Sequence, residues 1–371
     1  MKVKSVLLTG VLLAAAFFTA KTAAQTVTLP RAASPAGKVS QTIGISKITI
    51  KYSRPAVNGR EIWGALVHNG FQNLGFGPAK VSPWRAGANE NTTITFSHGA
   101  TLEGKPIDAG TYGLFLAVGE NQDATLILSK DNMSWGSYFY NESNDVLRVD
   151  INTEEISMTE RLTFDFINID DKSAMVVLDW EKRRFPFKVE FDVPEIVYAS
   201  LNEELKGSKG FTDQSWNAAA NYLLKNNLYL DEALAWSENA ISAPFFGQEN
   251  FNNLQLKSQI LSAKGKSDEA ETVMQEALVH PTANANNYYD YGRYLIGNGQ
   301  GMKALEVFQK LNKKWPDHWL ASHGMARGYS AIGDFKKALK HERIALEKAP
   351  DTSKQFLMGY IEQLEAGKDF N

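Results

Sequence analysis

The sequence predicts a multidomain fold, with an all-β antiparallel sandwich or barrel followed by an all-α helical repeat domain. Three observations support it. At 371 residues the chain exceeds the length at which one hydrophobic core usually keeps growing. Short segments before about residue 193 alternate apolar and polar residues, as half-buried strands do. After about residue 210 the alternation stops, and small residues recur once per predicted pair of helices.

The amino-terminal residues 1–24 have the pattern of a secretory signal peptide. Lys2 and Lys4 give a basic start, Val6–Ala20 is mostly apolar, and Thr22–Ala24 offers small residues for cleavage. The apolar run is shorter than the ~20 residues that a membrane span needs. We therefore expect an exported protein, periplasmic or extracellular, with no membrane span after signal cleavage.

Composition excludes several kinds of function. The chain has no cysteine, which rules out disulfides, thiol nucleophiles and thiolate metal ligands. Signal cleavage would remove Lys2, Lys4 and Lys21 and change the formal net charge from −3 to −6. A mildly acidic protein is a poor candidate for binding nucleic acid. His68 and His98 lack a third ligand at a recognisable spacing, so we expect no metal site and no cofactor.

Residues 25–37 lack periodicity and are predicted to be a leader, and residues 38–193 form the predicted β domain. Turn residues such as Gly, Asn and Asp separate the alternating segments, which favours many short antiparallel strands. The strand order is left open. The predicted strands are Ser46–Tyr52, Thr92–Phe96, Tyr112–Val118, Thr125–Leu128, Leu147–Ile151, Leu162–Ile167, Met175–Trp180 and Phe187–Phe191.

The second domain begins after a predicted linker over residues 194–210. Its repeat is defined by a small residue, a glycine five residues earlier and a proline 11 or 12 residues later, where a helix would end. The residues concerned are the alanines Ala233, Ala270, Ala304 and Ala338, the glycines Gly265, Gly299 and Gly333, and the prolines Pro281, Pro316 and Pro350. Residues 211–350 resemble tetratricopeptide repeats on these positions, and residues 351–371 are expected to form a capping helix and tail.

The β domain carries an unusual motif, Arg85-x-Gly-Ala-Asn-Glu90, which directly follows Trp84. Together with the segments at residues 52–64, 109–112 and 134–136, this motif resembles a bacterial family of exported proteins known as domain of unknown function 2911. The resemblance implies a β-rich domain and export. It implies no reaction, because that family has no assigned activity.

The motif region also supplies the candidate ligand-binding residues. Arginine side chains are forked donors suited to carboxylate or phosphate groups, and indole rings can stack on a sugar or an aromatic ring. The candidates are Arg54, Arg60, Trp84, Arg85, Asn89, Glu90 and Trp135. A purely structural interpretation is also open, in which Arg85 pairs with Glu90, Asn89 holds a turn and the Trp side chains fill the core.

Two functional hypotheses follow. In the first, a ligand-binding β domain for a small molecule or glycan is joined to helical repeats that bind a protein or peptide partner. In the second, the chain is a hydrolase of an envelope or glycan substrate, with Glu90 as the catalytic acid or base and Arg85 as its orienting partner. A third possibility is that the β domain is only a structural module.

Overall fold

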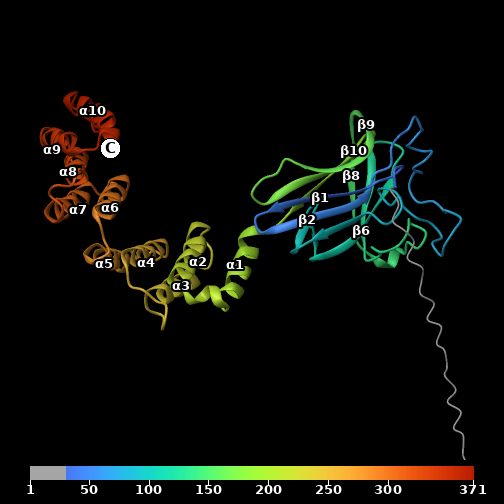
Figure 1. The fold of residues 1–371 in the computed structure, drawn as a ribbon, viewed down its shortest axis with the longest axis horizontal. Helices are drawn as coiled ribbons and strands as arrows, with labels where there is room; N and C mark the ends of the chain where they lie inside the picture. Colours follow the sequence, from blue (N-terminus) through green and yellow to red (C-terminus); the bar gives the residue numbers. More distant parts are fainter. Residues whose placement is uncertain (1–30) are drawn as a thin grey trace, which may run out of the picture. The chain divides into compact units, whose positions relative to one another are not determined.

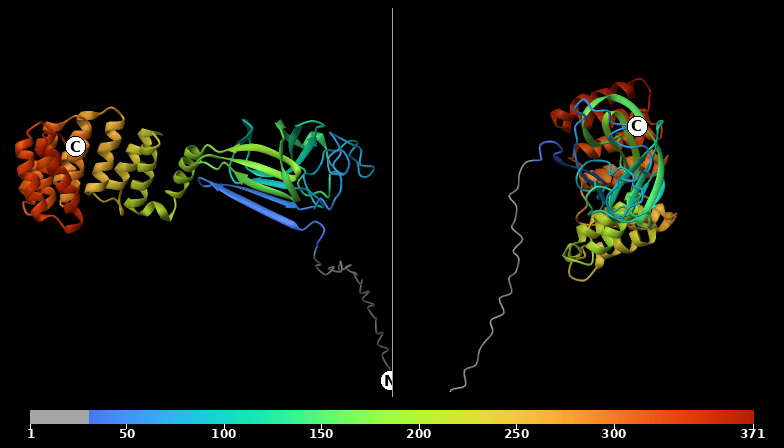
Figure 2. Two further views of the ribbon diagram at one scale, coloured as in Figure 1. Left: turned by 90° about the horizontal axis from the view of Figure 1, so that it is seen from above. Right: turned by 90° about the vertical axis from the view of Figure 1, so that its right-hand side faces the viewer.

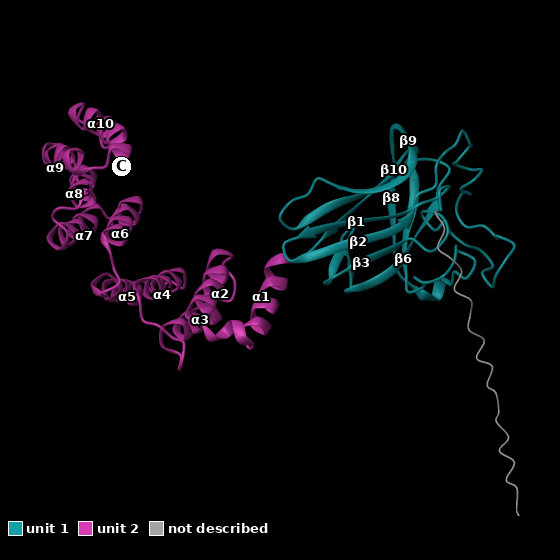
Figure 3. Cartoon of the chain, viewed as in Figure 1, with its two compact units in different colours: residues 1–191 teal, residues 192–371 magenta. Residues whose placement is uncertain are grey.

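The computed structural model describes residues 31–371 and divides the chain into two compact units (Figures 1 and 3). The first unit ends at Phe191 and the second comprises Asp192–Asn371. The predicted signal peptide and residues 25–30 of the predicted leader lie outside the described residues. Each unit has its own set of elements and its own buried residues.

The first unit contains two antiparallel sheets, seen from further directions in Figure 2. One sheet has six strands, in the order β1 (Ala36–Ile43), β2 (Ser46–Ser53), β3 (Thr93–Phe96), β6 (Gly110–Val118), β7 (Asp123–Ser129) and β8 (Asp145–Asn152). The other has four strands, in the order β5 (Lys105–Ile107), β4 (Ala100–Leu102), β10 (Ser173–Glu190) and β9 (Glu154–Ile167). Within the described residues neither sheet closes on itself, so the predicted antiparallel fold takes the open form and not the barrel.

Alternation in the sequence explains which face of each strand is buried. In β2, Ile48 and Ile50 are buried while Lys47 and Lys51 are exposed. On the same face, the Tyr52 ring packs edge-on against Phe164 of β9 with ring centres 4.9 Å apart, and the Tyr52 hydroxyl accepts a hydrogen bond from the Phe164 amide. The core of this unit therefore lies between its two sheets.

The segments 175–180 and 187–191, predicted as two strands, belong to one long strand, β10, except for Phe191, which follows its end. The pairing of β10 with β9 is irregular on both sides of Glu181, which has a positive φ of 56°. Residues 181–184 are all charged, so the alternation of apolar and polar residues is interrupted there. The backbone nevertheless continues as one strand through these irregular positions, which are β-bulges.

Residues 194–210, expected to be a linker, are mostly helical instead. They form α1 (Val193–Glu204) and most of the short 3-10 helix η2 (Ser208–Phe211). The Asp192 carboxylate accepts a hydrogen bond from the Glu195 amide, and a proline occupies the first turn of α1, where its missing N–H has no cost. The Tyr198 ring stacks on Tyr229 of the next helix pair at 4.0 Å, which ties α1 to the repeats.

The second unit consists of helix pairs, as the repeat pattern predicts. The pairs are α2 (Asp213–Lys225) with α3 (Leu230–Ser242), α4 (Phe251–Ala263) with α5 (Ser267–Val279), α6 (Ala285–Gly297) with α7 (Gly301–Lys314) and α8 (Trp319–Ala331) with α9 (Phe335–Lys348), followed by α10 (Asp351–Glu365). No helix of the described chain is both long and apolar enough to cross a membrane.

The residues that define the repeat have the predicted roles. The four marked alanines lie on the second helix of each pair and are all buried. The three glycines have φ values between 72° and 81°, in the left-handed region that glycine adopts at the end of a helix. Each proline follows the end of a second helix by two residues. The first pair has no such glycine, but Pro244 follows the end of α3 at the same distance.

Candidate functional site

Two loops of the β unit are held together beside the motif. The buried Asn91 side chain accepts a hydrogen bond from the Ser134 amide at 2.7 Å and donates one to the Gly136 carbonyl at 2.8 Å. The Gly136 amide donates to the Asn89 carbonyl at 2.9 Å. These contacts fix the segment of residues 84–92 against residues 134–137, so the two most distinctive stretches of the β unit meet in space.

This junction borders a cavity of about 530 Å³, which we call the Arg85 cavity. A volume of this size suits a small-molecule ligand. Its lining includes the predicted residues Arg60, Trp84 and Arg85 together with His68, Tyr138 and Trp180, and the remainder are Ala33, Ser34, Pro55, Asn58, Leu66, Val67, Leu74, Pro83, Gly87, Ala88 and Ser137. None of these residues is acidic.

Arg85 is the central polar group of the cavity. It forms no ion pair within residues 31–371, and its Nε is buried without a hydrogen-bond partner there. Burial lowers the pKa of the Arg85 guanidinium, and the adjacent phenol of Tyr138 acts in the opposite direction. The guanidinium remains charged, because an arginine pKa lies far above neutrality.

Aromatic rings form one wall of the cavity. The Trp84 and Trp180 rings are stacked with centres 5.8 Å apart and planes 18° apart. Trp63 packs edge-on against both rings. The Trp84 indole N–H donates to the Gly87 carbonyl at 3.3 Å. Trp84 therefore belongs to the packed core and also faces the cavity.

The other two candidate arginines are held by backbone and hydroxyl acceptors. Arg54 donates from Nε to the Leu162 carbonyl at 3.0 Å and from Nη2 to the Thr163 hydroxyl at 2.6 Å, which joins the two sheets. Arg60 donates from Nε to the Val57 carbonyl at 3.0 Å, within its own loop. Arg60 lines the cavity, whereas Arg54 does not.

Glu90, Asn89 and Trp135 lie outside the cavity lining. Glu90 is half exposed and accepts a hydrogen bond from Arg31 at 2.6 Å, so Arg85 and Glu90 do not pair. The hydrogen bond from Arg31 is the largest cause of a lowered pKa at Glu90. The Arg31 guanidinium also lies 5.8 Å from the centre of the exposed Trp135 ring. Asn89 donates weakly to the Ser34 carbonyl at 3.4 Å and has a positive φ of 63°.

Three aromatic residues that line the Arg85 cavity were not among the predicted site residues: His68, Tyr138 and Trp180. Trp180 comes from β10, nearly one hundred residues after the motif, and only the packing of the two sheets brings it to Trp84. His68 and Tyr138 lie on loops without regular periodicity. No local signal in the sequence marks these three residues as neighbours of Arg85.

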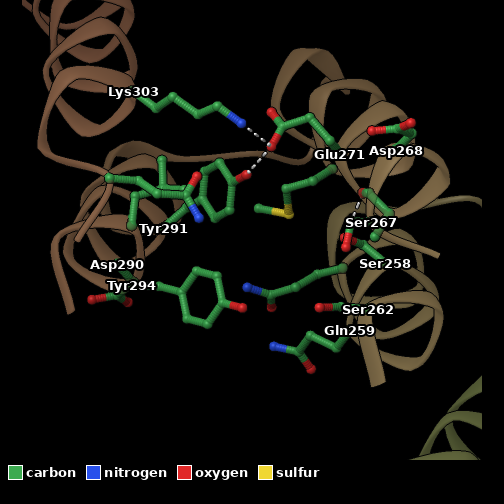
Figure 4. Close-up of a pocket in the computed structure, with 15 residues that line it drawn as sticks. Ser258, Gln259, Ser262, Ser267, Asp268, Glu271, Asp290, Tyr291, Tyr294 and Lys303 are labelled. Carbon is green, nitrogen blue, oxygen red and sulfur yellow. Dashed lines mark hydrogen bonds and ion pairs between the residues drawn. The ribbon is translucent and has the colours of Figure 1, made fainter. Parts of the chain in front are cut away.

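The helical unit has a pocket of its own, of about 420 Å³, between the second and third helix pairs (Figure 4). Tyr291 donates from its hydroxyl to Glu271 Oε2 at 3.0 Å, and Lys303 Nζ lies 3.9 Å from the same oxygen. Burial, followed by the charge of Glu271, raises the pKa of Tyr291. The remaining lining residues are Gln255, Ser258, Gln259, Ser262, Ser267, Asp268, Ala270, Met274, Asp290, Tyr294, Leu295 and Gln300. Three carboxylates against one ammonium give the pocket a negative net charge.

The described residues contain no cluster of three or more His, Asp or Glu side chains able to hold a metal ion.

The fold defines a protein in which an antiparallel β unit precedes a unit of tetratricopeptide-like helix pairs. Residues 34–189 match the model of a family described as a protein of unknown function (DUF2911). The match confirms the resemblance of the β unit to that family. No curated protein matches the sequence.

Solved structures similar to the helical part are tetratricopeptide repeat proteins. YrrB, described as a TPR protein with an unusual peptide-binding site, is 20% identical, with 46% of this chain and 84% of that chain covered and a TM-score of 0.32. MamA is 17% identical, with 44% and 85% covered and a TM-score of 0.32. TTC0263, a thermophilic TPR protein of Thermus thermophilus, is 17% identical, with 47% and 91% covered and a TM-score of 0.32. The assignment of the helical unit rests on the helix pairs and buried alanines described above.

Proposed function

We propose that the protein is an exported binding protein, with a β unit that holds a small ligand and a helical unit that holds a segment of a partner protein. The observation that supports the helical role is the acidic pocket between the second and third helix pairs (Figure 4). Helix-pair stacks bury their apolar faces against each other and leave surfaces for extended segments. The side chains that line this pocket therefore indicate which residue of the partner segment binds there.

The lining of the pocket favours a basic side chain. Asp268 and Asp290 form no ion pair within the described chain and are exposed at its rim. The Tyr294 ring, 55% exposed, stacks on Tyr291 with planes 16° apart and offers a face on which a guanidinium can lie. Glutamine amides from Gln255 and Gln259 supply donors and acceptors for a peptide backbone. The best fit is an extended segment carrying an Arg or Lys.

The test uses the full chain and nine-residue peptide libraries with Arg, Lys, Gln or Glu fixed at the centre. We expect the Arg and Lys libraries to bind about fivefold more tightly than the Gln library, since an exposed ion pair contributes up to about 1 kcal/mol. The combined variant Asp268→Asn and Asp290→Asn should lose this preference. Asp351→Asn, which removes an exposed carboxylate of α10, is the matched control and should keep it. Equal binding of the Glu library would contradict the proposal.

The proposal of export is supported by the basic and apolar pattern of residues 1–24. When the full sequence is expressed in a bacterium, the mature protein should be recovered outside the cytoplasm without these residues, as intact mass spectrometry would show. A cytoplasmic protein that keeps residue 1 would contradict export. This test of export does not depend on whether either proposed binding site is correct.

The geometry does not favour the alternative hydrolase. Glu90 is exposed, paired with Arg31 and outside the lining of the Arg85 cavity. A carboxyl with a lowered pKa is ionised at neutral pH and is a poor proton donor. Burial raises the pKa of Glu90 by less than the hydrogen bonds from Arg31 and its own backbone lower it, so the carboxyl lacks the raised pKa that an acid catalyst requires.

A further inference from the structure

We propose that the Arg85 cavity binds a small organic anion, a carboxylate or a phosphate group carried on an apolar or aromatic body. This inference rests on the binding role proposed for the β unit and names the chemistry of its ligand. Three features of the cavity lining support it: an uncompensated charge, buried nitrogen atoms without hydrogen-bond partners and an apolar wall.

The first feature is the charge of Arg85. A guanidinium withdrawn from water normally has a carboxylate partner, because an uncompensated buried charge is costly. No lining residue of the cavity is acidic. Residues 1–30, outside the described part of the chain, contain no Asp or Glu either, so none of their side chains can supply the partner. An anion brought by a ligand is the partner that the cavity lacks.

The second feature is a set of buried nitrogen atoms without hydrogen-bond partners. They are Arg85 Nε and Trp180 Nε1, which are donors, and His68 Nδ1, whose role depends on the tautomer; all three lie beneath the cavity surface, on residues that line it. Trp180 is 1% exposed, and its indole nitrogen can only donate. Burial lowers the pKa of His68, although the backbone groups of Asn69 and Gly70 oppose this effect. Unmade hydrogen bonds of buried donors are expensive, so an acceptor-rich ligand would stabilise the site.

The third feature is the wall beside these donors. The Trp84 and Trp180 rings and the side chains of Leu66, Val67 and Leu74 border the same space. Such a wall can accept an apolar or aromatic body next to the anion. A few convergent polar groups beside an apolar wall are typical of small-molecule sites.

The backbone around Arg85 is shaped to hold its side chain in place. Ala86 has a φ of 49° and is buried, which is unfavourable for a residue with a Cβ. Gly136 has a φ of 65°, and a Cβ there would come within 2.9 Å of Arg85 Nη1. Backbone strain of this kind tends to occur where function requires a fixed geometry.

The experiment titrates the full chain with benzoate, phenyl phosphate and benzamide, which share a ring and differ in charge. Binding is followed by calorimetry and by the fluorescence of the tryptophans. We expect saturable binding of at least one anion and about tenfold weaker binding of neutral benzamide, as for the loss of a charge-assisted hydrogen bond. Tighter binding of benzoate would indicate a carboxylate ligand, and tighter binding of phenyl phosphate would indicate a phosphate ligand.

The variants separate the charge of Arg85 from its structural role. Arg85→Gln should weaken anion binding about tenfold or more, and Arg85→Lys should restore part of it, because the charge returns without the fork. Arg31→Gln, an exposed arginine outside the lining, is the matched control and should bind like the native chain. Circular dichroism verifies that each variant is folded.

The inference would be overturned by no saturable binding of either anion, or by equal anion binding by the native chain and Arg85→Gln. The peptide libraries test the helical pocket with separate variants, so their failure would leave anion binding unaffected. If instead benzamide binds as tightly as the anions, the β unit binds small molecules but the proposed charge recognition is wrong.

Discussion

Phe308→Ala should lower the free energy of unfolding of the helical unit by about 3–5 kcal/mol, as large-to-small changes of a buried phenylalanine do. Phe308 of α7 is 0% exposed. Its ring lies against Gly292 of α6 and against Gly324 and Gly328 of α8, and a Cβ on either Gly292 or Gly324 would overlap with it. The ring thus joins the third and fourth helix pairs. Urea unfolding followed by far-ultraviolet circular dichroism measures the loss.

Two further variants test the same contact by changing Gly292, the residue against which the Phe308 ring packs. Gly292→Ala adds a methyl group where the ring lies and should cost about 1–3 kcal/mol. Combining Gly292→Ala with Phe308→Leu should give a smaller loss than the sum of the two single changes, because the smaller side chain makes room for the methyl group. Phe356→Ala, on the exposed face of α10, is the control. A loss below about 1 kcal/mol for Phe308→Ala would contradict the account.

The second large effect is expected at His323. This buried residue lies with Nδ1 2.8 Å from Oε2 of Glu342, which is 0% exposed, and Arg327 donates from Nε to His323 Nε2 at 3.3 Å. These partners place the imidazole proton on Nδ1, so a neutral His323 donates to Glu342. His323→Phe keeps the ring but removes the donor, and should cost about 3–5 kcal/mol because the Glu342 carboxylate is left buried without a partner. Adding Glu342→Leu should recover most of the loss, whereas no recovery would contradict this explanation.

The same pair predicts a pH dependence. Burial, the largest cause, lowers the pKa of His323 below its ordinary value of 6.5, while Glu342 raises it and Arg327 and Arg293 lower it further. The unfolded chain therefore takes up the proton first, and this stability is lost as the pH falls from about 6.5 through the folded pKa. The loss should be smaller in the double variant His323→Phe, Glu342→Leu. His341, whose pKa is also lowered by burial, accounts for part of the remaining slope.

The repeat was predictable because the alanine, glycine and proline that define it have the same structural role each time they occur. A buried alanine allows two helices to approach, and a glycine with positive φ ends the first helix, so the spacing alone reveals the architecture. The helix α1 was missed because none of its residues is fully buried, so the sequence lacks the apolar stripe that marks the other helices. The strand β1 was also missed, and its first two residues fall in the predicted leader over residues 25–37. The short strands β4 and β5 were missed because three residues are too few to show alternation.

The candidate site was predictable only in part. The motif pointed to Trp84 and Arg85, which line the cavity, because an arginine can bind an anionic group and an indole ring can stack on a ligand. Glu90 is as close to Arg85 in sequence, yet its side chain pairs with Arg31 at the surface. Trp180 and His68 reach the cavity through the packing of distant segments. Which neighbours in sequence share a cavity depends on backbone direction, and here Ala86 and Asn89, both at positive φ, change it within the motif.

The most direct measurement of the central claim is nuclear magnetic resonance of the side-chain N–H groups of Arg85 and Trp180, two residues that line the Arg85 cavity. Signals of Arg85 Nε and Trp180 Nε1 are assigned by comparison with Arg85→Gln and Trp180→Phe. On titration with benzoate or phenyl phosphate, both should shift in a saturable way, while the Arg54 Nε signal, bonded to Leu162, stays in place. Arg85 and Trp180 signals that remain unmoved at saturating concentrations of both anions would contradict the claim that these donors hold an anion.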